Sequence, residues 1–437
     1  MTIDITSAAI AAKAASKRLA IFDQRAKNDA LERMATALEV SSAGLMAENR
    51  QDVENAKTQV TAGALSSAAL ARLTLTPEKI LQMSASVRAV RALEDPVGRI
   101  LLQSQLDEGL ELKKISCPFG VIAAIVEARP DAVVQLSALA LKSGNALMIK
   151  AGAEIGRTAS AIVALLSQAA ESVGEAPASA FTHVEGREAA RELLALHEYV
   201  DLMIPRGSAE LVRFVSTHTR IPVLGHADGV CHIYVDAAAN REMAISLILD
   251  SKTQAPSTCN AVETVLVDAA IAGEFLPLLV DALHAHKVKT RGCAMTRSVC
   301  RQQMEAVAQD EWRLEYGDLT LAIRVVNGLH GALDHIEGFG SHHTDCIVTD
   351  DRSAAERFLR EVDSAGVFHN VSTRFSDGYR YGFGAEVGIS TGKLHARGPV
   401  GLEGLVTYKY VLSGKGHCVS QYSGPGARRF QHEMNFS

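Results

Sequence analysis

The chain has 437 residues, of which 47% are hydrophobic and 22% are charged, as in an ordinary globular protein. This length exceeds what one hydrophobic core usually supports, so we expect two or three lobes. The formal net charge of −6 disfavours a nucleic-acid partner, because phosphate backbones attract clustered positive charge. Apolar runs are too short to span a bilayer, and residues 1–4 lack the basic character of a secretion signal. We therefore expect a cytoplasmic protein that acts on a small molecule.

Seven cysteines are scattered along the chain, and none forms a C-x-x-C pair. An odd number of widely spaced cysteines is typical of reduced thiols rather than of a disulfide scaffold. A structural zinc site is also not expected.

The first segment, residues 6–58, is alanine-rich with apolar residues at helical spacing behind a candidate cap at Asn28. Beyond it, short β-branched runs alternate with helical patterns, which is typical of βαβ units and a parallel sheet. In the first half we expect strands at 121–126, 146–150 and 200–204 and helices at 131–143, 157–173 and 209–215. A second series starts after residue 251, with strands at 262–267, 321–326 and 346–349. Two α/β lobes are therefore predicted to meet near residue 250.

Phosphate-binding signals are weak. Neither a G-x-G-x-x-G fingerprint nor a P-loop is present, so a kinase is not expected. Residues 206–210 follow an expected strand and open an expected helix, where backbone N–H groups suit a pyrophosphate. A tight turn with a serine cap at Ser208 explains the same residues equally well.

Cys259 lies in the small-residue loop 252–261, ahead of an apolar strand. A thiol on such a loop can act as a nucleophile. The alternative is a buried cysteine that fills space like a small apolar residue.

Other polar residues follow or interrupt the expected strands. Glu127 and Arg129 stand where α/β folds place ligands, at the carboxyl end of a strand, although a surface ion pair is the alternative. The adjacent His342 and His343 should point to opposite faces of an extended segment, so no metal site is expected there. His226 is interpreted as a structural or hydrogen-bonding residue.

A family resemblance rests on several motifs taken together. They are Pro118-Phe119-Gly120-Val121-Ile122 with Glu127-Ala128-Arg129-Pro130, Lys142-Ser143-Gly144-Asn145-Ala146, the run 259–264, the run 370–375, and the run 394–405. In this order, from about residue 10 to about residue 420, the chain resembles the gamma-glutamyl phosphate reductases of the aldehyde dehydrogenase superfamily.

The resemblance implies an aldehyde dehydrogenase-like α/β fold, with two parallel-sheet lobes and a β-flap for oligomerisation. The NADPH-binding lobe would span residues 1–250, with part of the flap near 100–120. The catalytic lobe would span 251–400, and residues 401–437 would return to the oligomerisation segment. A homo-oligomer is therefore expected.

The resemblance also implies roles for individual residues. Cys259 would be the nucleophile, and its own backbone N–H or the neighbouring Asn260 would stabilise an oxyanion. The cofactor NADPH would be held by Lys150 at the adenosine ribose, by the turn Gly207 and Ser208 at the pyrophosphate, and by Glu315 at the nicotinamide ribose.

The substrate implied by the resemblance is L-glutamyl 5-phosphate, made by a separate glutamate 5-kinase. Its two anions require fixed cations, for which Arg129, Arg374 and Arg397 are the candidates. Glu127 and Ser372 are the other candidate substrate residues, and 372–375 would line the substrate tunnel opposite Arg129.

Two positions depart from the oxidising aldehyde dehydrogenases. Gly225 stands where those enzymes have a general-base glutamate, and Ala128 stands where they have an oxyanion-hole asparagine. Without a base to activate water, reduction of the acyl phosphate to L-glutamate 5-semialdehyde is favoured. The alternatives are an oxidising NAD(P)-dependent aldehyde dehydrogenase, and a binding protein that has lost the chemistry.

Overall fold

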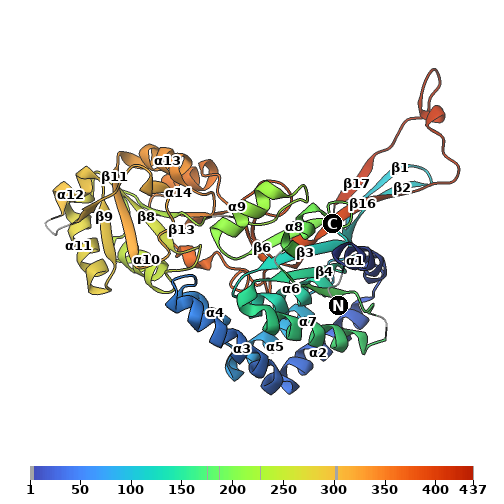
Figure 1. The fold of residues 1–437 in the computed structure, drawn as a ribbon. Helices are drawn as coiled ribbons and strands as arrows, with labels where there is room; N and C mark the ends of the chain where they lie inside the picture. The colour runs from blue at the N-terminus through green and yellow to red at the C-terminus, as the bar shows by residue number, and fades with distance from the viewer. Residues whose placement is uncertain (1–3, 175, 187, 227, 301–303, 437) are drawn as a thin grey trace. The chain divides into compact units, whose positions relative to one another are not determined.

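The computed structural model describes residues 4–174, 176–186, 188–226, 228–300 and 304–436, which form two compact units (Figure 1). The first unit comprises Met1–Leu224, Phe383–Gly388 and Val400–Ser437, and the second comprises Gly225–Gly382 and Ile389–Pro399. The sequence placed the change of lobe near residue 250. The structure places it at Leu224, because β7 (Cys231–Val235) already belongs to the second sheet and α10 (Arg241–Thr253) to the second unit. Within the described residues, no helix is long and apolar enough to cross a membrane.

The first unit begins with helices, as the alanine-rich segment predicts. They are α1 (Ile5–Leu19), α2 (Gln24–Val40), α3 (Ser42–Thr61), α4 (Ser67–Leu73) and α5 (Pro77–Ala92). Helix α2 starts at the side chain of Asp23, which accepts a hydrogen bond from the Ala26 N–H at 2.7 Å. The predicted cap at Asn28 is wrong, because Asn28 lies inside α2, where its Oδ1 accepts a hydrogen bond from Lys142 Nζ at 2.7 Å.

A four-stranded parallel sheet follows, in the order β5-β4-β3-β6. Its strands are β3 (Val121–Val126), β4 (Ala146–Ala151), β5 (Phe181–Val184) and β6 (Leu202–Arg206), and the accompanying helices are α6 (Pro130–Lys142), α7 (Gly156–Glu171), α8 (Glu188–Ala195) and α9 (Ala209–His218). Every residue of β3 is buried, as expected for an interior parallel strand. Helix α6 has Pro130 in its first turn, and Gly144, with φ +74°, follows its end.

The predicted flap is an antiparallel sheet of order β16-β2-β1-β17. Its strands are β1 (Ile100–Asp107), β2 (Leu110–Pro118), β16 (Val406–Ser413) and β17 (Glu433–Phe436). The edge strand β16 exposes the side chains of Tyr408, Tyr410 and Leu412. A role for this sheet in oligomerisation stays a prediction.

The second unit contains a parallel sheet of order β10-β9-β11-β8-β7-β12-β13. Besides β7, its strands are β8 (Val262–Asp268), β9 (Lys289–Gly292), β10 (Glu305–Ala306), β11 (Thr320–Val326), β12 (Thr344–Val348) and β13 (Gly366–His369). Besides α10, its helices are α11 (Ala272–Ala285), α12 (Ala294–Val299), α13 (Gly328–Phe339) and α14 (Arg352–Glu361). The short strands β14 (Gly388–Ser390) and β15 (Gly398–Val400) lie where the chain passes between units.

Helices cover both faces of this second sheet. Ile233 of β7 packs in one apolar cluster with Phe275 of α11, and the next residue, Tyr234, packs in another cluster with Phe358 of α14. Successive side chains of a strand point to opposite faces, so α11 and α14 lie on opposite faces of the sheet. Because both faces of this sheet are covered, the ends of its strands are held in fixed positions. The candidate site lies at one of the two edges where these strands end.

Candidate active site

The candidate site lies at the amino edge of the second sheet. Cys259 is in the loop between α10 and β8, Gly229 precedes β7, His343 precedes β12, and Glu315 precedes β11. These four strands are neighbours in the order β11-β8-β7-β12. Because the strands are parallel, their amino ends meet at the same edge, and the four loops converge there.

The backbone of Gly229 packs directly against Cys259. A Cβ atom added at Gly229 would lie 2.6 Å from the Cys259 Cα, a distance that real side chains do not adopt. The Gly229 N–H donates a hydrogen bond to Glu315 Oε2 at 2.7 Å. Burial raises the pKa of Glu315, and this N–H opposes the rise. The structure therefore brings Glu315, a predicted cofactor residue, to the loop that carries Cys259.

Two imidazoles lie beside the thiol. One ring nitrogen of His226, one of His343 and the Cys259 Sγ all lie within 4.8 Å of one another. Cys231 Sγ also donates a hydrogen bond to the Cys259 carbonyl oxygen at 3.3 Å. The sequence interpretation missed this arrangement. The available signal was that His343 and Cys259 each come just before a buried apolar strand.

Arg374 contacts the Cys259 loop directly. Its side chain is buried, its Nε donates to Gln254 Oε1 at 2.8 Å, and its Nη1 donates to Thr258 Oγ1 at 2.7 Å. Burial lowers the pKa of Arg374, and the neighbouring Arg380 adds to this effect. A buried guanidinium whose charge is disfavoured in this way is suited to binding an anion.

Asn260 and Ser372 have protein partners of their own. Asn260 Nδ2 donates to the Ser376 carbonyl oxygen at 2.8 Å, and the Thr258 hydroxyl donates to Asn260 Oδ1 at 3.0 Å. The Ser372 and Ser251 hydroxyls share a hydrogen bond of 2.9 Å. The Asn260 contacts hold the Cys259 loop in place, and the Ser372 contact joins its own loop to α10. The oxyanion role of Asn260 and the substrate role of Ser372 stay predictions.

Arg397 pairs with a different group. Its Nη1 donates to Asp363 Oδ1 at 2.7 Å, and its Nη2 donates to the Asp363 carbonyl oxygen at 2.9 Å. Lys393 and Arg397 together lower the pKa of Asp363 to about 2. The structure thus gives Arg397 an internal anion to neutralise, whereas Arg374 lies against the Cys259 loop.

In the first unit, the predicted pyrophosphate turn binds an anion from its own chain. Ser208 caps α9. The Ser208 backbone N–H and hydroxyl donate hydrogen bonds to Glu127 Oε2, at 2.8 Å and 3.0 Å. A Cβ atom at Gly207 would lie 2.8 Å from Glu127 Cδ, so the close approach of the carboxylate requires glycine. The turn therefore fits a negatively charged oxygen. Glu127, predicted to contact substrate, here contacts a predicted cofactor residue.

The other predicted residues of this unit lie at carboxyl ends of strands. Lys150 is half-buried near the end of β4, and Arg129 is half-buried at the start of α6, just after β3. Ala128, just before Arg129, has a positive φ of 48°, and its N–H donates to Glu154 Oε1 at 2.6 Å.

The aldehyde dehydrogenase family matches residues 2–310 of the chain. A gamma-glutamyl phosphate reductase from Synechococcus sp. is 52% identical, over 96% of this chain and 92% of that protein. One from Natronomonas pharaonis is 46% identical, over 97% of this chain and 96% of that protein. The chain belongs to the gamma-glutamyl phosphate reductase family.

Solved structures agree with this assignment. The crystal structure of gamma-glutamyl phosphate reductase from Thermotoga maritima has a TM-score of 0.91 and 38% identity, covering 95% of this chain and 99% of that one. An acetylating aldehyde dehydrogenase from Geobacillus thermoglucosidasius, at 19% identity and a TM-score of 0.66, shares the fold. The aldehyde dehydrogenase-like α/β fold predicted from the sequence is confirmed.

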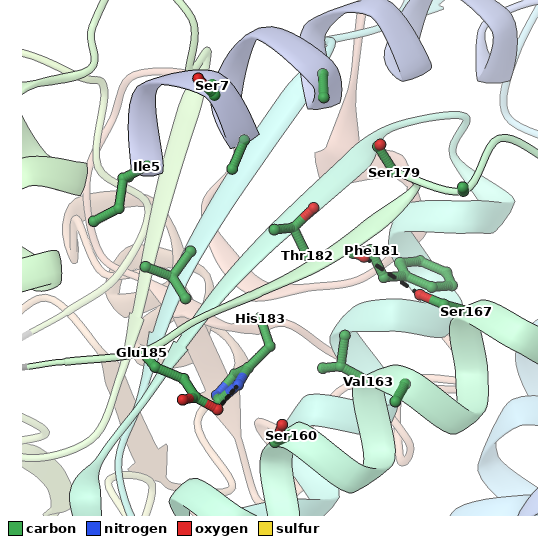
Figure 2. Close-up of a pocket in the computed structure, with 15 residues that line it drawn as sticks. Ile5, Ser7, Ser160, Val163, Ser167, Ser179, Phe181, Thr182, His183 and Glu185 are labelled. Atoms are coloured by element: carbon green, nitrogen blue, oxygen red, sulfur yellow. Dashed lines mark hydrogen bonds and ion pairs between the residues drawn. The ribbon is translucent and has the colours of Figure 1, made fainter. Parts of the chain in front are cut away.

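The first unit of this gamma-glutamyl phosphate reductase family member also contains a pocket of about 700 Å³ between α1, α7 and β5. Figure 2 shows His183 and Glu185 directed toward one another on one side, and Ser160 and Val163 of α7 on the other. The described residues that line this pocket include none of the predicted cofactor residues. We therefore assign it no part in the reaction.

Proposed function

We propose that this chain reduces L-glutamyl 5-phosphate to L-glutamate 5-semialdehyde with NADPH and releases phosphate, which is the second step of proline biosynthesis from glutamate. The observation that carries the proposal is the 52% identity to a gamma-glutamyl phosphate reductase over 96% of the chain. The partner that supplies the substrate would be a separate glutamate 5-kinase.

The first chemical step belongs to Cys259. Its thiolate attacks the γ-carbonyl carbon, a C–S bond forms, and the C–O bond to phosphate breaks with its electron pair leaving on phosphate. His226 and His343 lie close enough to receive the thiol proton, directly or through one water molecule. The product of this step is a thioacyl enzyme.

The substrate anions need cations near the thiol. Arg374 is suited to this task because its buried guanidinium is held against the Cys259 loop by Gln254 and Thr258. Arg129 and Arg397 remain proposed contributors. Oxyanion stabilisation would come from the Cys259 backbone N–H or from Asn260.

For the cofactor, Lys150, Gly207 and Ser208 would hold the adenosine and pyrophosphate parts, and Glu315 the nicotinamide ribose. The turn at Gly207 and Ser208 fits because it already binds the carboxylate of Glu127. Glu127 would have to turn away when a pyrophosphate binds there. When bound, NADPH supplies the hydride that converts the thioester carbonyl to the aldehyde.

Oxidation of aldehydes with hydrolysis is the competing function. In the oxidising aldehyde dehydrogenases a glutamate activates water on the thioacyl enzyme, and this chain has Gly225 where that glutamate would stand. Hydrolysis would also waste an activated substrate.

The test is NADPH oxidation with glutamyl phosphate generated in place by glutamate kinase and ATP, compared with NADH. Cys259→Ala should abolish reduction and leave NADPH binding nearly intact. Cys293→Ser is the matched control, because serine can keep the cap that Cys293 provides for α12. Substantial turnover by Cys259→Ala would exclude Cys259 as the nucleophile, and absence of reduction by the wild type would exclude the proposed function.

A further inference from the structure

The two histidines beside Cys259 can do more than receive its proton, because with the thiol they form a group of three potential metal ligands. His226, Cys259 and His343 come from the loops before β7, β8 and β12, which are adjacent strands. Each offers one ligand atom, and these three atoms lie within 4.8 Å of one another. The two imidazole rings are 5.0 Å apart and meet edge to face at 72°.

Both rings are anchored through Nδ1. His226 Nδ1 is 2.9 Å from the Ile389 carbonyl oxygen. A carbonyl only accepts, so Nδ1 carries a proton, and Nε2 is the ring nitrogen that a metal ion would bind. A backbone carbonyl in this position is a common orienting partner of metal-binding histidines.

His343 provides an independent observation. Its Nδ1 is 2.9 Å from Thr344 Oγ1, and its side chain is fully buried. Among the described residues, its Nε2 has no hydrogen-bond partner. A buried ring nitrogen without a partner is costly, and a donor or a cation at this point would remove the cost.

We propose that Cys259 Sγ and the Nε2 atoms of His226 and His343 bind one Zn²⁺ ion, and that this ion reversibly inhibits the enzyme. Zn²⁺ accepts nitrogen and sulfur ligands in a tetrahedron, and three protein ligands leave one position for water. With metal–ligand bonds of about 2.0 to 2.3 Å, tetrahedral ligand atoms lie roughly 3.3 to 3.8 Å apart. From separations of at most 4.8 Å, the three atoms must approach by no more than about 1 to 1.5 Å to reach that spacing.

The charge balance favours a cation here. On binding, the thiol releases its proton to solvent and the sulfur coordinates as thiolate. The Glu315 carboxylate interacts electrostatically with His226 and contributes negative charge to the cluster. His342, next in sequence to His343, is not one of the three residues whose ligand atoms lie together, and its Nδ1 bonds the Asp363 carbonyl oxygen at 2.8 Å.

Inhibition follows from the identity of the sulfur ligand. A thiolate whose lone pair is bound to Zn²⁺ cannot attack the acyl phosphate. This consequence rests on the proposed function, but metal binding does not, so the two are tested separately.

The binding test uses the metal-free full chain titrated with Co²⁺, followed by displacement with Zn²⁺. We expect the near-ultraviolet absorption of a thiolate–cobalt bond, saturating at about one ion per chain. Cys259→Ser should lose the band. His226→Asn, which can still donate to Ile389, and His343→Asn should each weaken binding at least ~100-fold, because even loss of an outer partner costs about 10- to 100-fold.

The controls are His342→Asn, which tolerates the positive φ of 58° at that position, and Cys293→Ser. Both should bind Co²⁺ as the wild type does. If His343→Asn does not fold, the partly exposed His226 carries the test alone. Absence of the thiolate–cobalt band in the wild type, or a band unchanged in His226→Asn, would overturn the site.

The activity test measures Zn²⁺ inhibition of NADPH oxidation and its reversal by EDTA. The residual activity of His226→Asn should be less sensitive to Zn²⁺ than the wild type by a similar factor. Cobalt binding in a chain without reductase activity supports the site and contradicts the proposed function. Reductase activity that Zn²⁺ leaves unchanged despite cobalt binding overturns the inhibitory role.

Discussion

At Gly229 the backbone leaves no room for a side chain, because a Cβ atom there would lie 2.6 Å from the Cys259 Cα. Gly229→Ala should therefore displace Cys259. A misplacement of about 1 Å at a reacting group costs on the order of 100-fold in rate, so we expect at least that loss in kcat with NADPH binding retained. Steady-state kinetics and NADPH fluorescence titration measure the two effects.

Gly273→Ala is the matched control for this substitution. Gly273 lies in α11, and a Cβ atom added there would meet no atom within 4 Å. Because alanine favours helix formation, this variant should keep full activity and gain slightly in stability. Wild-type kcat in Gly229→Ala would show that the Cys259 loop tolerates the displacement.

Arg374 should contribute through its charge and its fork of donors. Arg374→Ala should cost roughly 2 to 5 kcal/mol in kcat/KM, the range for removing one side of a buried charged pair. Arg374→Lys should recover only part of the lost kcat/KM. A single ammonium group cannot bond Gln254 and Thr258 and also bind the substrate anion through two parallel hydrogen bonds. Unchanged kcat/KM in both variants would place the substrate anion elsewhere.

An ion pair joins α10 to β8, the two elements on either side of the Cys259 loop. Lys252 in the last turn of α10 donates to Glu263 of β8 at 2.7 Å, and both side chains are fully buried. Burial raises the pKa of Glu263, and Lys252 opposes the rise. The pair thus fixes the two elements from which the loop emerges.

Breaking this pair should destabilise the chain strongly. Lys252→Met leaves a buried carboxylate without its partner, which costs about 3 to 5 kcal/mol in the free energy of unfolding. Lys252→Met/Glu263→Met removes both charges and should regain most of that loss. Urea unfolding of the two variants measures the difference. Equal stability of the single variant and the wild type would show that Glu263 is protonated in the native state.

The elements themselves were predictable because their signals are local. The strand at 121–126 and the helix that follows it were expected from apolar runs, Pro130 and Gly144, and the structure has both. The cap of α2 was misplaced because Asp23 precedes the apolar pattern that was used to place it. Cys259 was proposed from its motif, and its role as nucleophile stays a prediction.

The neighbours of Cys259 were not predictable in the same way. Gly229, Glu315 and His343 are far apart in sequence and meet only because β11, β8, β7 and β12 are adjacent. Hydrophobic periodicity predicts strands but not their order in a sheet, so no histidine could be predicted to lie near the thiol. The pairing of Arg397 with Asp363 is hidden for the same reason.

Across the whole molecule, the chain leaves the first unit at Leu224 and returns to it at Phe383 and again at Val400. The C-terminal segment supplies β16 and β17 to the sheet of β1 and β2. Each unit is therefore assembled from distant parts of the sequence, which is why a division into consecutive segments could not describe them.

The direction of chemistry can be tested on the intact enzyme run in reverse. With glutamate semialdehyde and NADP, the thioacyl enzyme should form, but the glutamate that would activate water is replaced by Gly225. Phosphate must then act as the acceptor, so sustained NADPH production should depend on added phosphate, and arsenate should substitute for it. Without either anion we expect at most about one turnover per site, because the thioacyl intermediate forms but has no acceptor to release it. Sustained production of glutamate without phosphate would instead identify an oxidising aldehyde dehydrogenase.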